Sequence, residues 1–255
     1  MEKAAVCLTF GEQSENHAGM EINGDGLADS GFTVGELQDI KLKLEANRIP
    51  SELHILNRAL DNPEDAIEAA VLFIKNGVQT LIGEDAKKMY KEQLQFDWDR
   101  KYWDNRRQKV LNKRARFNVC YGEKSVEPDY ENKRGTIVGF DKVPTLKKLK
   151  DNLSLFFGEK ASDLEVEGNL YYDVSKCGIG FHGDSERKRV IACSLGAKRP
   201  IHWQWYQNSK PIGERIKFEL EGGDMYIMSE KATGFDWKKR SQKTLRHAAG
   251  VKYVN

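Results

Sequence analysis

The spacing of apolar residues in the first hundred positions predicts short strands that alternate with helices. Residues 4–10 form an apolar run of strand length. Residues 33–47 repeat leucine and isoleucine at helical spacing. A second helix is expected after Pro63, where a largely apolar segment is closed by Gly77, because proline commonly begins a helix and glycine ends one. The pattern therefore predicts a small α/β unit in residues 1–98.

Beyond about residue 116 the pattern changes to short strands that are separated by many glycines. One helix interrupts them. Residues 144–157 begin with proline and repeat leucine every three or four positions, with the lysines mostly on another face. A helix of this kind packs beneath a sheet. We therefore expect an α+β fold in which a β-sandwich or barrel with helical support occupies residues 99–255.

The composition is typical of a globular enzyme inside the cell. Of the 255 residues, 39% are hydrophobic and 31% are charged, which suits a chain that buries a sizeable core. No apolar run approaches the roughly 20 residues of a membrane span, and the first apolar stretch is too short for a signal peptide. An intracellular location, in the cytoplasm or nucleus, is expected. Four widely spaced cysteines indicate reduced thiols rather than disulfides.

The positive charge is concentrated in one window of the chain. Residues 99–118 hold eight lysines or arginines against two aspartates, although the net charge of the whole chain is only +2. Tyr102, Trp103 and Phe117 are interleaved with these cations, a mixture that can neutralise phosphates and stack on bases. The window therefore indicates a nucleic-acid partner. A solvated, charged helix face would give the same composition and remains an alternative.

The candidate metal ligands are His182 and Asp184, which follow a run of strand-like residues. Residues two apart on a strand share a face, so both side chains can reach one metal ion. An imidazole and a carboxylate at this spacing, completed by a distant histidine, form the facial set that leaves iron positions open. The pair alone is a weak signal, because it arises by chance in many proteins.

The surroundings of this pair resemble the AlkB family. The resemblance covers about residues 108 to 251 and rests on the order and rough spacing of seven short segments, namely residues 116–123, the helix beginning at Pro144, and residues 169–173, 182–184, 194–196, 223–224 and 240–246. It implies a double-stranded β-helix (jelly-roll) core and an oxidoreductase that uses iron(II), 2-oxoglutarate and O2. A demethylase or hydroxylase acting on a nucleic-acid base is the function that the resemblance implies.

The resemblance also implies roles for individual residues. His182 and Asp184 look like the iron ligands, and Asn169 and Tyr171 look like groups that hydrogen-bond 2-oxoglutarate. Arginine binds carboxylates through its planar fork. The two arginines that resemble the carboxylate-binding pair of the family are Arg240 and Arg246.

The second iron-binding histidine departs from the family pattern. No histidine lies between Gly223 and Arg240, and His247 is the only one after His202. Because His247 directly follows Arg246, a regular strand points the two side chains to opposite faces. A bulge can turn both side chains inward. Alternatively, His247 binds iron while another basic residue such as Lys252 or Arg240 holds 2-oxoglutarate. In a third alternative, water completes the coordination of iron by His182 and Asp184. We favour His247 as the ligand. His202 is expected in the core or the pocket wall.

The candidate substrate contacts come from two segments, one of which resembles the substrate-covering segment of base-oxidising relatives. These candidates are Arg114, Arg116, Tyr121, Glu123, Glu186 and Arg187. Ordinary surface charge is the alternative interpretation. A protein side-chain hydroxylase of the same superfamily and a non-catalytic nucleic-acid-binding derivative are the alternative functions. His17, in a polar loop, is a further histidine suited to acid-base work, although no partner can be named for it from the sequence.

Overall fold

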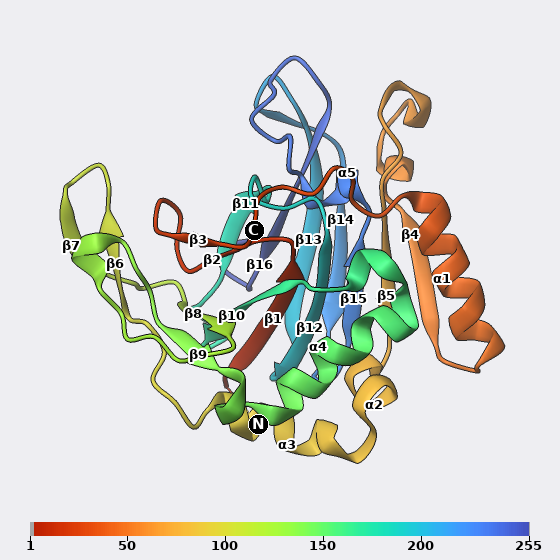
Figure 1. The fold of residues 1–255 in the computed structure, drawn as a ribbon. Coiled ribbons are helices and arrows are strands. Elements are labelled where there is room, and N and C mark those ends of the chain that lie inside the picture. Colours follow the sequence, from red (N-terminus) through yellow and green to blue (C-terminus); the bar gives the residue numbers. More distant parts are fainter. Residues whose placement is uncertain (1–2, 255) are drawn as a thin grey trace.

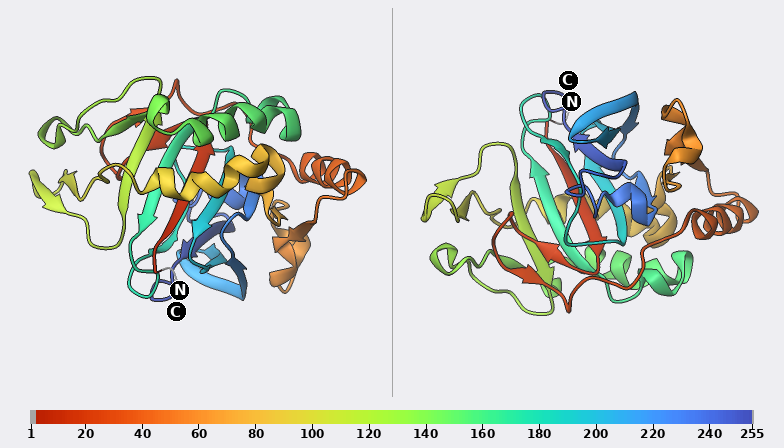
Figure 2. Two further views of the ribbon diagram at one scale, coloured as in Figure 1. Left: turned by 90° about the horizontal axis from the view of Figure 1, so that it is seen from below. Right: turned by 90° about the horizontal axis from the view of Figure 1, so that it is seen from above.

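The computed structural model describes residues 3–254, which fold into a layer of helices, a large sheet and a smaller sheet (Figures 1 and 2). The large sheet has the order β4 (Ser51–Ile55), β5 (Ala70–Ile74), β15 (Met225–Met228), β12 (Val190–Gly196), β1 (Ala5–Gly11), β10 (Glu165–Tyr171), β8 (Phe117–Gly122) and β9 (Ile137–Gly139). The small sheet has the order β11 (Ile179–His182), β16 (Thr244–Ala249), β13 (Arg199–Gln207) and β14 (Lys210–Leu220). All neighbouring strands are antiparallel except β8 and β9. The mixed α+β class expected from the sequence is confirmed.

The helical layer covers one face of the large sheet (Figure 2). It consists of α1 (Val34–Ala46), α2 (Gly77–Ile82), α3 (Ala86–Gln93) and α4 (Pro144–Phe157), while the short α5 (Glu230–Thr233) lies near β16. The helices expected over residues 33–47 and 144–157 are both confirmed. Thr33 accepts the backbone N–H of Glu36, and the Glu36 side chain accepts the N–H of Thr33, so a capping box fixes the start of α1.

Strand β1 shows why the large sheet sits between two cores. Its residues Val6, Leu8 and Phe10 face the helices, whereas Ala5 and Cys7 face the small sheet. Side chains alternate along a strand, so a strand that is covered on both faces is apolar throughout. The second core lies between the two sheets, and the candidate site lies in the same space.

The segment after Pro63 is not the helix that was expected. A short 3-10 turn spans Pro63–Asp65, and β5 follows. Each residue of β5 is buried, with Leu72 facing the helices and Phe73 facing the small sheet. A strand buried on both faces gives an unbroken apolar run, which has the same appearance in sequence as a buried helix. Helix α2 starts only at Gly77, the residue that was expected to end a helix.

The N-terminal segment is part of the large sheet. Strand β1 pairs with β10 on one side and β12 on the other, and β5 pairs with β15. The boundary expected between residues 98 and 99 therefore does not divide the sheet, and the expectation of an α/β unit of its own in residues 1–98 needs this correction. Its strands could not be assigned to the sheet from sequence because their partners lie far along the chain.

Two hairpins extend from the sheets near the candidate site. Strands β6 (Lys101–Asp104) and β7 (Lys109–Asn112) form a hairpin that projects at the left of Figure 1. Strands β2 (Ser14–Glu15) and β3 (Ile22–Asn23) form the second, which lies between that hairpin and β11 in the same view. The four cysteines are buried and unpaired in residues 3–254, as the sequence indicated. No helix in the same range has the length and apolar character needed to cross a membrane.

Candidate metal centre

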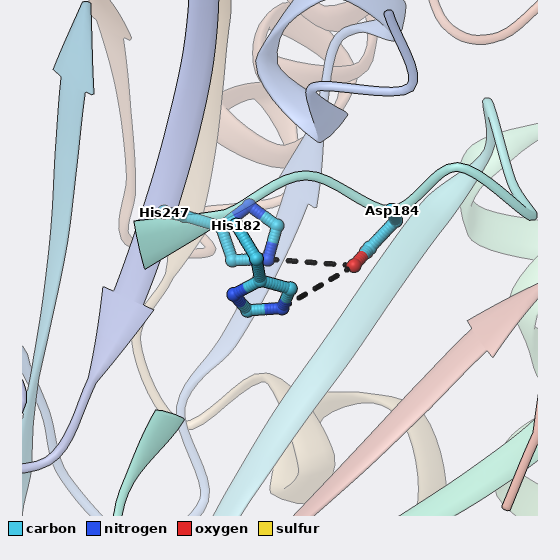
Figure 3. A group of neighbouring side chains, drawn as sticks. All are labelled: His182, Asp184 and His247. Atoms are coloured by element: carbon cyan, nitrogen blue, oxygen red, sulfur yellow. Dashed lines mark ion pairs between the residues drawn. The ribbon is translucent and has the colours of Figure 1, made fainter. Parts of the chain in front are cut away.

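Three side chains with metal-binding atoms meet between the two sheets. His182 on β11 and His247 on β16 occupy directly opposed positions of an antiparallel pair. Asp184 follows two residues after β11, and its Oδ1 atom lies 3.6 Å from Nε2 of each histidine (Figure 3). The candidate ligand atoms all lie within 4.8 Å of one another. The structure therefore brings together the three residues that the sequence suggested.

Local irregularities produce this arrangement. The pairing of β11 with β16 shifts in register between Ile179 and His182, which turns His182 toward the space between the sheets. The expectation that His182 and Asp184 share a strand face is wrong, because the strand ends at His182. A turn carries Asp184 instead, and its N–H donates to the carbonyl oxygen of Thr233 at 3.0 Å. At Gly183 a Cβ atom would overlap the Gly234 carbonyl oxygen, so this close approach requires glycine.

Burial sets the protonation of the three groups in the metal-free protein. Desolvation lowers the pKa of His182 to about 4 and holds the pKa of His247 well below its usual value, so both imidazoles are neutral near pH 7. Nδ1 of His182 lies 2.8 Å from the Gly180 carbonyl oxygen, which leaves Nε2 on the side of Asp184. Burial raises the pKa of Asp184 to about 8, against the opposing effect of Arg187. A cation at this point would favour the ionised carboxylate.

The three groups line a cavity of about 570 Å³ between the sheets. Asn169 and Tyr171 lie on the same face of β10, as their spacing predicted, and both line this cavity. Asn169 is already engaged: its oxygen accepts from Arg116 Nε at 2.7 Å and from Asn118 at 2.5 Å, and its amide donates to Glu167. Tyr171 keeps its hydroxyl in the cavity wall without such a network among the described residues.

Arg240 and Arg246 do not line the cavity, contrary to the expectation from the resemblance. Strand β16 is regular, so Arg246 points away from His247 and its guanidinium stacks over the Tyr206 ring at 4.0 Å. Arg240 is exposed in the loop before β16, and Lys252 is exposed after it. The bulge lies in β11 and not in β16. For this reason His247 faces the cavity and its neighbour Arg246 does not.

Arg199 is the cavity arginine that sequence reasoning missed. It begins β13, is 2% exposed, and lies with its guanidinium 5.0 Å from the centroid of the Tyr171 ring. Its side chain hydrogen-bonds Tyr226, its Nε and Nη2 atoms have no hydrogen-bond partner, and within residues 3–254 no carboxylate pairs with it. Alternation along β13 could have predicted that Arg199 faces inward, because it shares its strand face with the buried Ile201 and Trp203. His202 lies on the other face, outside the cluster.

Three of the expected substrate contacts do line the cavity. Arg116 and Glu186 contribute to its wall. Arg187 also does, but it is 3% exposed rather than at the rim. Its Nη2 atom donates to Glu167 at 2.6 Å and to Glu186 at 2.7 Å, and its Nε lies 4.0 Å from Asp184. Arg187 therefore links the acidic residues of the wall to the candidate ligand.

The other three candidates lie elsewhere. Tyr121 on β8 faces the helices, where its hydroxyl donates to Gln93 in the core. Glu123 is exposed beyond the end of β8, and Arg114 is exposed beside the β6–β7 hairpin. Alternation along β8 explains the error for Tyr121, because residues whose side chains face the helices cannot also face the cavity.

Fold and site define a mixed α+β protein with a large, mostly antiparallel sheet and a buried histidine, aspartate and histidine cluster suited to a divalent metal. The sequence matches no model of a known protein family. It is 39% identical over 248 residues to "Uncharacterized protein R156" of Acanthamoeba polyphaga mimivirus, with 97% of this chain and 96% of that protein covered. The chain therefore belongs to the same family as this mimivirus protein.

Proposed function

We propose that the protein is an iron(II) and 2-oxoglutarate dependent dioxygenase with a double-stranded β-helix core, which hydroxylates or demethylates a nucleic-acid base. The single observation that carries the proposal is the buried Arg199, which no carboxylate neutralises within residues 3–254, in the same cavity as the His182, Asp184 and His247 cluster. A metal-ligand set and an unpaired cation in one cavity match a co-substrate that is both a chelator and a carboxylate.

The donor set fits iron(II). Two neutral imidazoles and one carboxylate are the ligands of the facial arrangement that keeps positions open for other groups. Their convergence within 4.8 Å allows a single ion to reach all three. Structural zinc sites usually use four protein ligands, including cysteine. Among residues 3–254, a fourth protein donor does not join the cluster, which favours the open site.

The cavity also fits a dicarboxylate. A buried guanidinium without a counter-ion is costly, and an incoming carboxylate would remove that cost while it accepts two parallel hydrogen bonds. Arg199 lines the cavity, and its buried Nε and Nη2 atoms have no hydrogen-bond partner. The ring of Tyr171 lies beneath the same guanidinium, and its hydroxyl is a further hydrogen-bond donor for a carboxylate. In this proposal Arg199 takes the role first expected of Arg240 and Arg246.

The bound metal and co-substrate would supply the oxidation of a C–H bond by O2, and the chain supplies the rest. His182, Asp184 and His247 would hold the metal, and Arg199 would orient the co-substrate. Arg116 and Glu186 lie in the cavity wall, where they can contact a base. Hydroxylation of an N-methyl group would release formaldehyde, whereas a C-methyl group would give a stable hydroxymethyl base.

The test is iron(II) binding and conversion of 2-oxoglutarate to succinate without added substrate. Wild type is compared with His182→Ala, His247→Ala and Arg199→Met. We expect the histidine variants to lose metal binding and turnover, and Arg199→Met to keep metal binding while it loses saturation by 2-oxoglutarate. Wild-type protein that binds neither iron nor 2-oxoglutarate would contradict the proposal. Coupled turnover on methylated oligonucleotides, measured against a peptide library, then tests the class of substrate.

A further inference from the structure

A second hollow lies beside the metal cavity, between the β6–β7 hairpin and the start of β8. We call it the hairpin groove. Its volume is about 600 Å³. His17 and Arg116 line both the groove and the metal cavity, so the two spaces meet at these residues. In Figure 1 the hairpin that forms its outer wall stands clear of the sheets.

The groove is positively charged. Its lining cations are Arg107, Lys109, Lys113, Arg114 and Arg116, and none of the described residues that line it is a carboxylate. Arg107 pairs with Asp104, and Lys113 donates to Asn16. Lys109 and Arg114 are exposed and form no ion pair within residues 3–254. Such an uncompensated surface attracts polyanions, and its effect is strongest at low salt.

Aromatic rings mark the junction of the groove with the metal cavity. The rings of His17 and Tyr102 are stacked, with centroids 3.8 Å apart and planes 20° apart. Burial, followed by the charge of Lys113, lowers the pKa of His17 to about 4, so this ring is neutral near pH 7. Flat, neutral rings next to cations are the combination on which bases stack while phosphates are neutralised.

We propose that the hairpin groove binds the sugar-phosphate backbone of a single-stranded nucleic acid, while one base passes His17 and Arg116 into the metal cavity. The inference rests on the proposed function for the fate of that base, but not for the binding of the strand. It makes the substrate a polymer rather than a free nucleotide. It also makes the β6–β7 hairpin, rather than the helical layer, the surface that the strand meets first.

The first experiment measures binding of a labelled oligonucleotide of roughly 12 nucleotides to metal-free protein across a range of salt concentrations. Each phosphate contact on a single strand contributes about 0.7 to the slope of log affinity against log salt. The Lys109→Gln/Arg114→Gln variant should therefore lower the slope by about 1.4 and weaken binding roughly tenfold or more at 0.1 M salt. An unchanged slope and affinity would overturn the proposal.

A matched control removes the same charge elsewhere. Lys210 and Lys217 are exposed on β14, away from the groove lining. The Lys210→Gln/Lys217→Gln variant has the same net charge as the groove variant and should bind the oligonucleotide as wild type does. If the two variants weaken binding equally, the attraction belongs to the whole surface, and the groove is not the site.

A third variant separates the contribution of base stacking to binding from that of the phosphate contacts. Tyr102→Ala should weaken oligonucleotide binding by about tenfold and leave the salt slope unchanged, because stacking releases no counter-ions. Poly-glutamate of equal charge should compete poorly. If poly-glutamate competes as well as the oligonucleotide and Tyr102→Ala has no effect, the groove binds an acidic protein segment instead and the proposal fails.

The two proposals can fail separately. His182→Ala should abolish turnover and leave the salt slope of oligonucleotide binding unchanged, because His182 does not line the groove that holds the phosphates. Strand binding without iron-dependent turnover in the wild type would contradict only the oxygenase. Turnover of 2-oxoglutarate without salt-dependent strand binding would contradict only the groove.

Discussion

His182 and His247 face each other across neighbouring strands, with ring centroids 4.4 Å apart. A metal bound between them would tie β11 to β16 and hold the turn that carries Asp184. A ligand that binds only the folded state raises the free energy of unfolding, by about 4 kcal/mol at a concentration of 1,000 times its dissociation constant. We expect iron(II), manganese(II) or cobalt(II), added in such an excess, to raise the melting temperature by several degrees.

Differential scanning fluorimetry without oxygen measures this shift. The shift should vanish in His182→Ala and His247→Ala. His54, half-exposed on β4, provides the control, and His54→Ala should keep the full shift. A shift that persists in both cluster variants would place the metal elsewhere.

Arg199 is predicted to serve ligand binding at the expense of stability. Hydrogen bonds to charged groups contribute about 1.5–3 kcal/mol, so Arg199→Met should weaken 2-oxoglutarate binding by roughly 10- to 100-fold. Without ligand, the same variant should unfold with an equal or higher free energy, because an unpaired buried charge is replaced by an apolar side chain. Calorimetry and urea unfolding measure the two effects.

The control for Arg199 is Arg246→Met, since Arg246 lies on the face of β16 opposite His247. It should leave 2-oxoglutarate affinity unchanged. A loss of several kcal/mol in ligand-free Arg199→Met would instead mark Arg199 as structural.

Arg187 is predicted to be the opposite case, an arginine that the fold requires. Arg187→Met would leave Glu167 and Glu186 without their cation, and breaking a buried pair in this way costs about 3–5 kcal/mol. Urea unfolding of the metal-free variant measures the loss. Arg240→Met, the same change at an exposed position, should alter the free energy of unfolding by no more than about 0.5 kcal/mol. Equal stability of the two variants would refute the assignment.

His17 is predicted to make stability depend on pH. Its pKa is lowered to about 4 in the folded protein, so between the usual value near 6.5 and 4 the unfolded chain takes up a proton that the folded protein does not. Stability contributed by the neutral ring is therefore complete above about pH 6.5 and is lost as the pH falls toward 4. We expect His17→Gln to reduce the difference in unfolding free energy between pH 7 and pH 5 by up to about 2 kcal/mol.

The same comparison with His54→Gln gives the reference, because His54 is half-exposed on β4. If His17→Gln and His54→Gln change the pH dependence equally, the lowered pKa of His17 has no effect on stability.

Signals within one element were sufficient to predict α1 and α4. The cap at Thr33 and the proline at residue 144 mark where α1 and α4 begin, and the leucine spacing gives their buried faces. The pairing of the strands could not be predicted in this way. Register pairs Ala5 with Tyr171, and no local pattern identifies a partner at that separation. For β5 the apolar run indicates burial but leaves the choice between helix and strand open.

The site could be predicted where residue type alone was informative. His247 is the only histidine after His202 and was favoured for that reason, and it does lie beside His182 and Asp184. The carboxylate-binding arginines were assigned by resemblance, and the structure has Arg246 on the wrong face. Strand parity around Arg199 would have identified an inward-facing arginine, because its face of β13 is otherwise apolar and aromatic.

The position of β1 has a consequence for how the protein is made. This strand is synthesised well before both of its neighbours, β10 and β12. Until β10 and β12 have been synthesised, the apolar strand β1 stays unpaired on both edges in the nascent chain, where it can pair with a wrong strand. Folding dominated by such distant contacts is slow. The growing chain should therefore depend on chaperones until β10 and β12 have been synthesised.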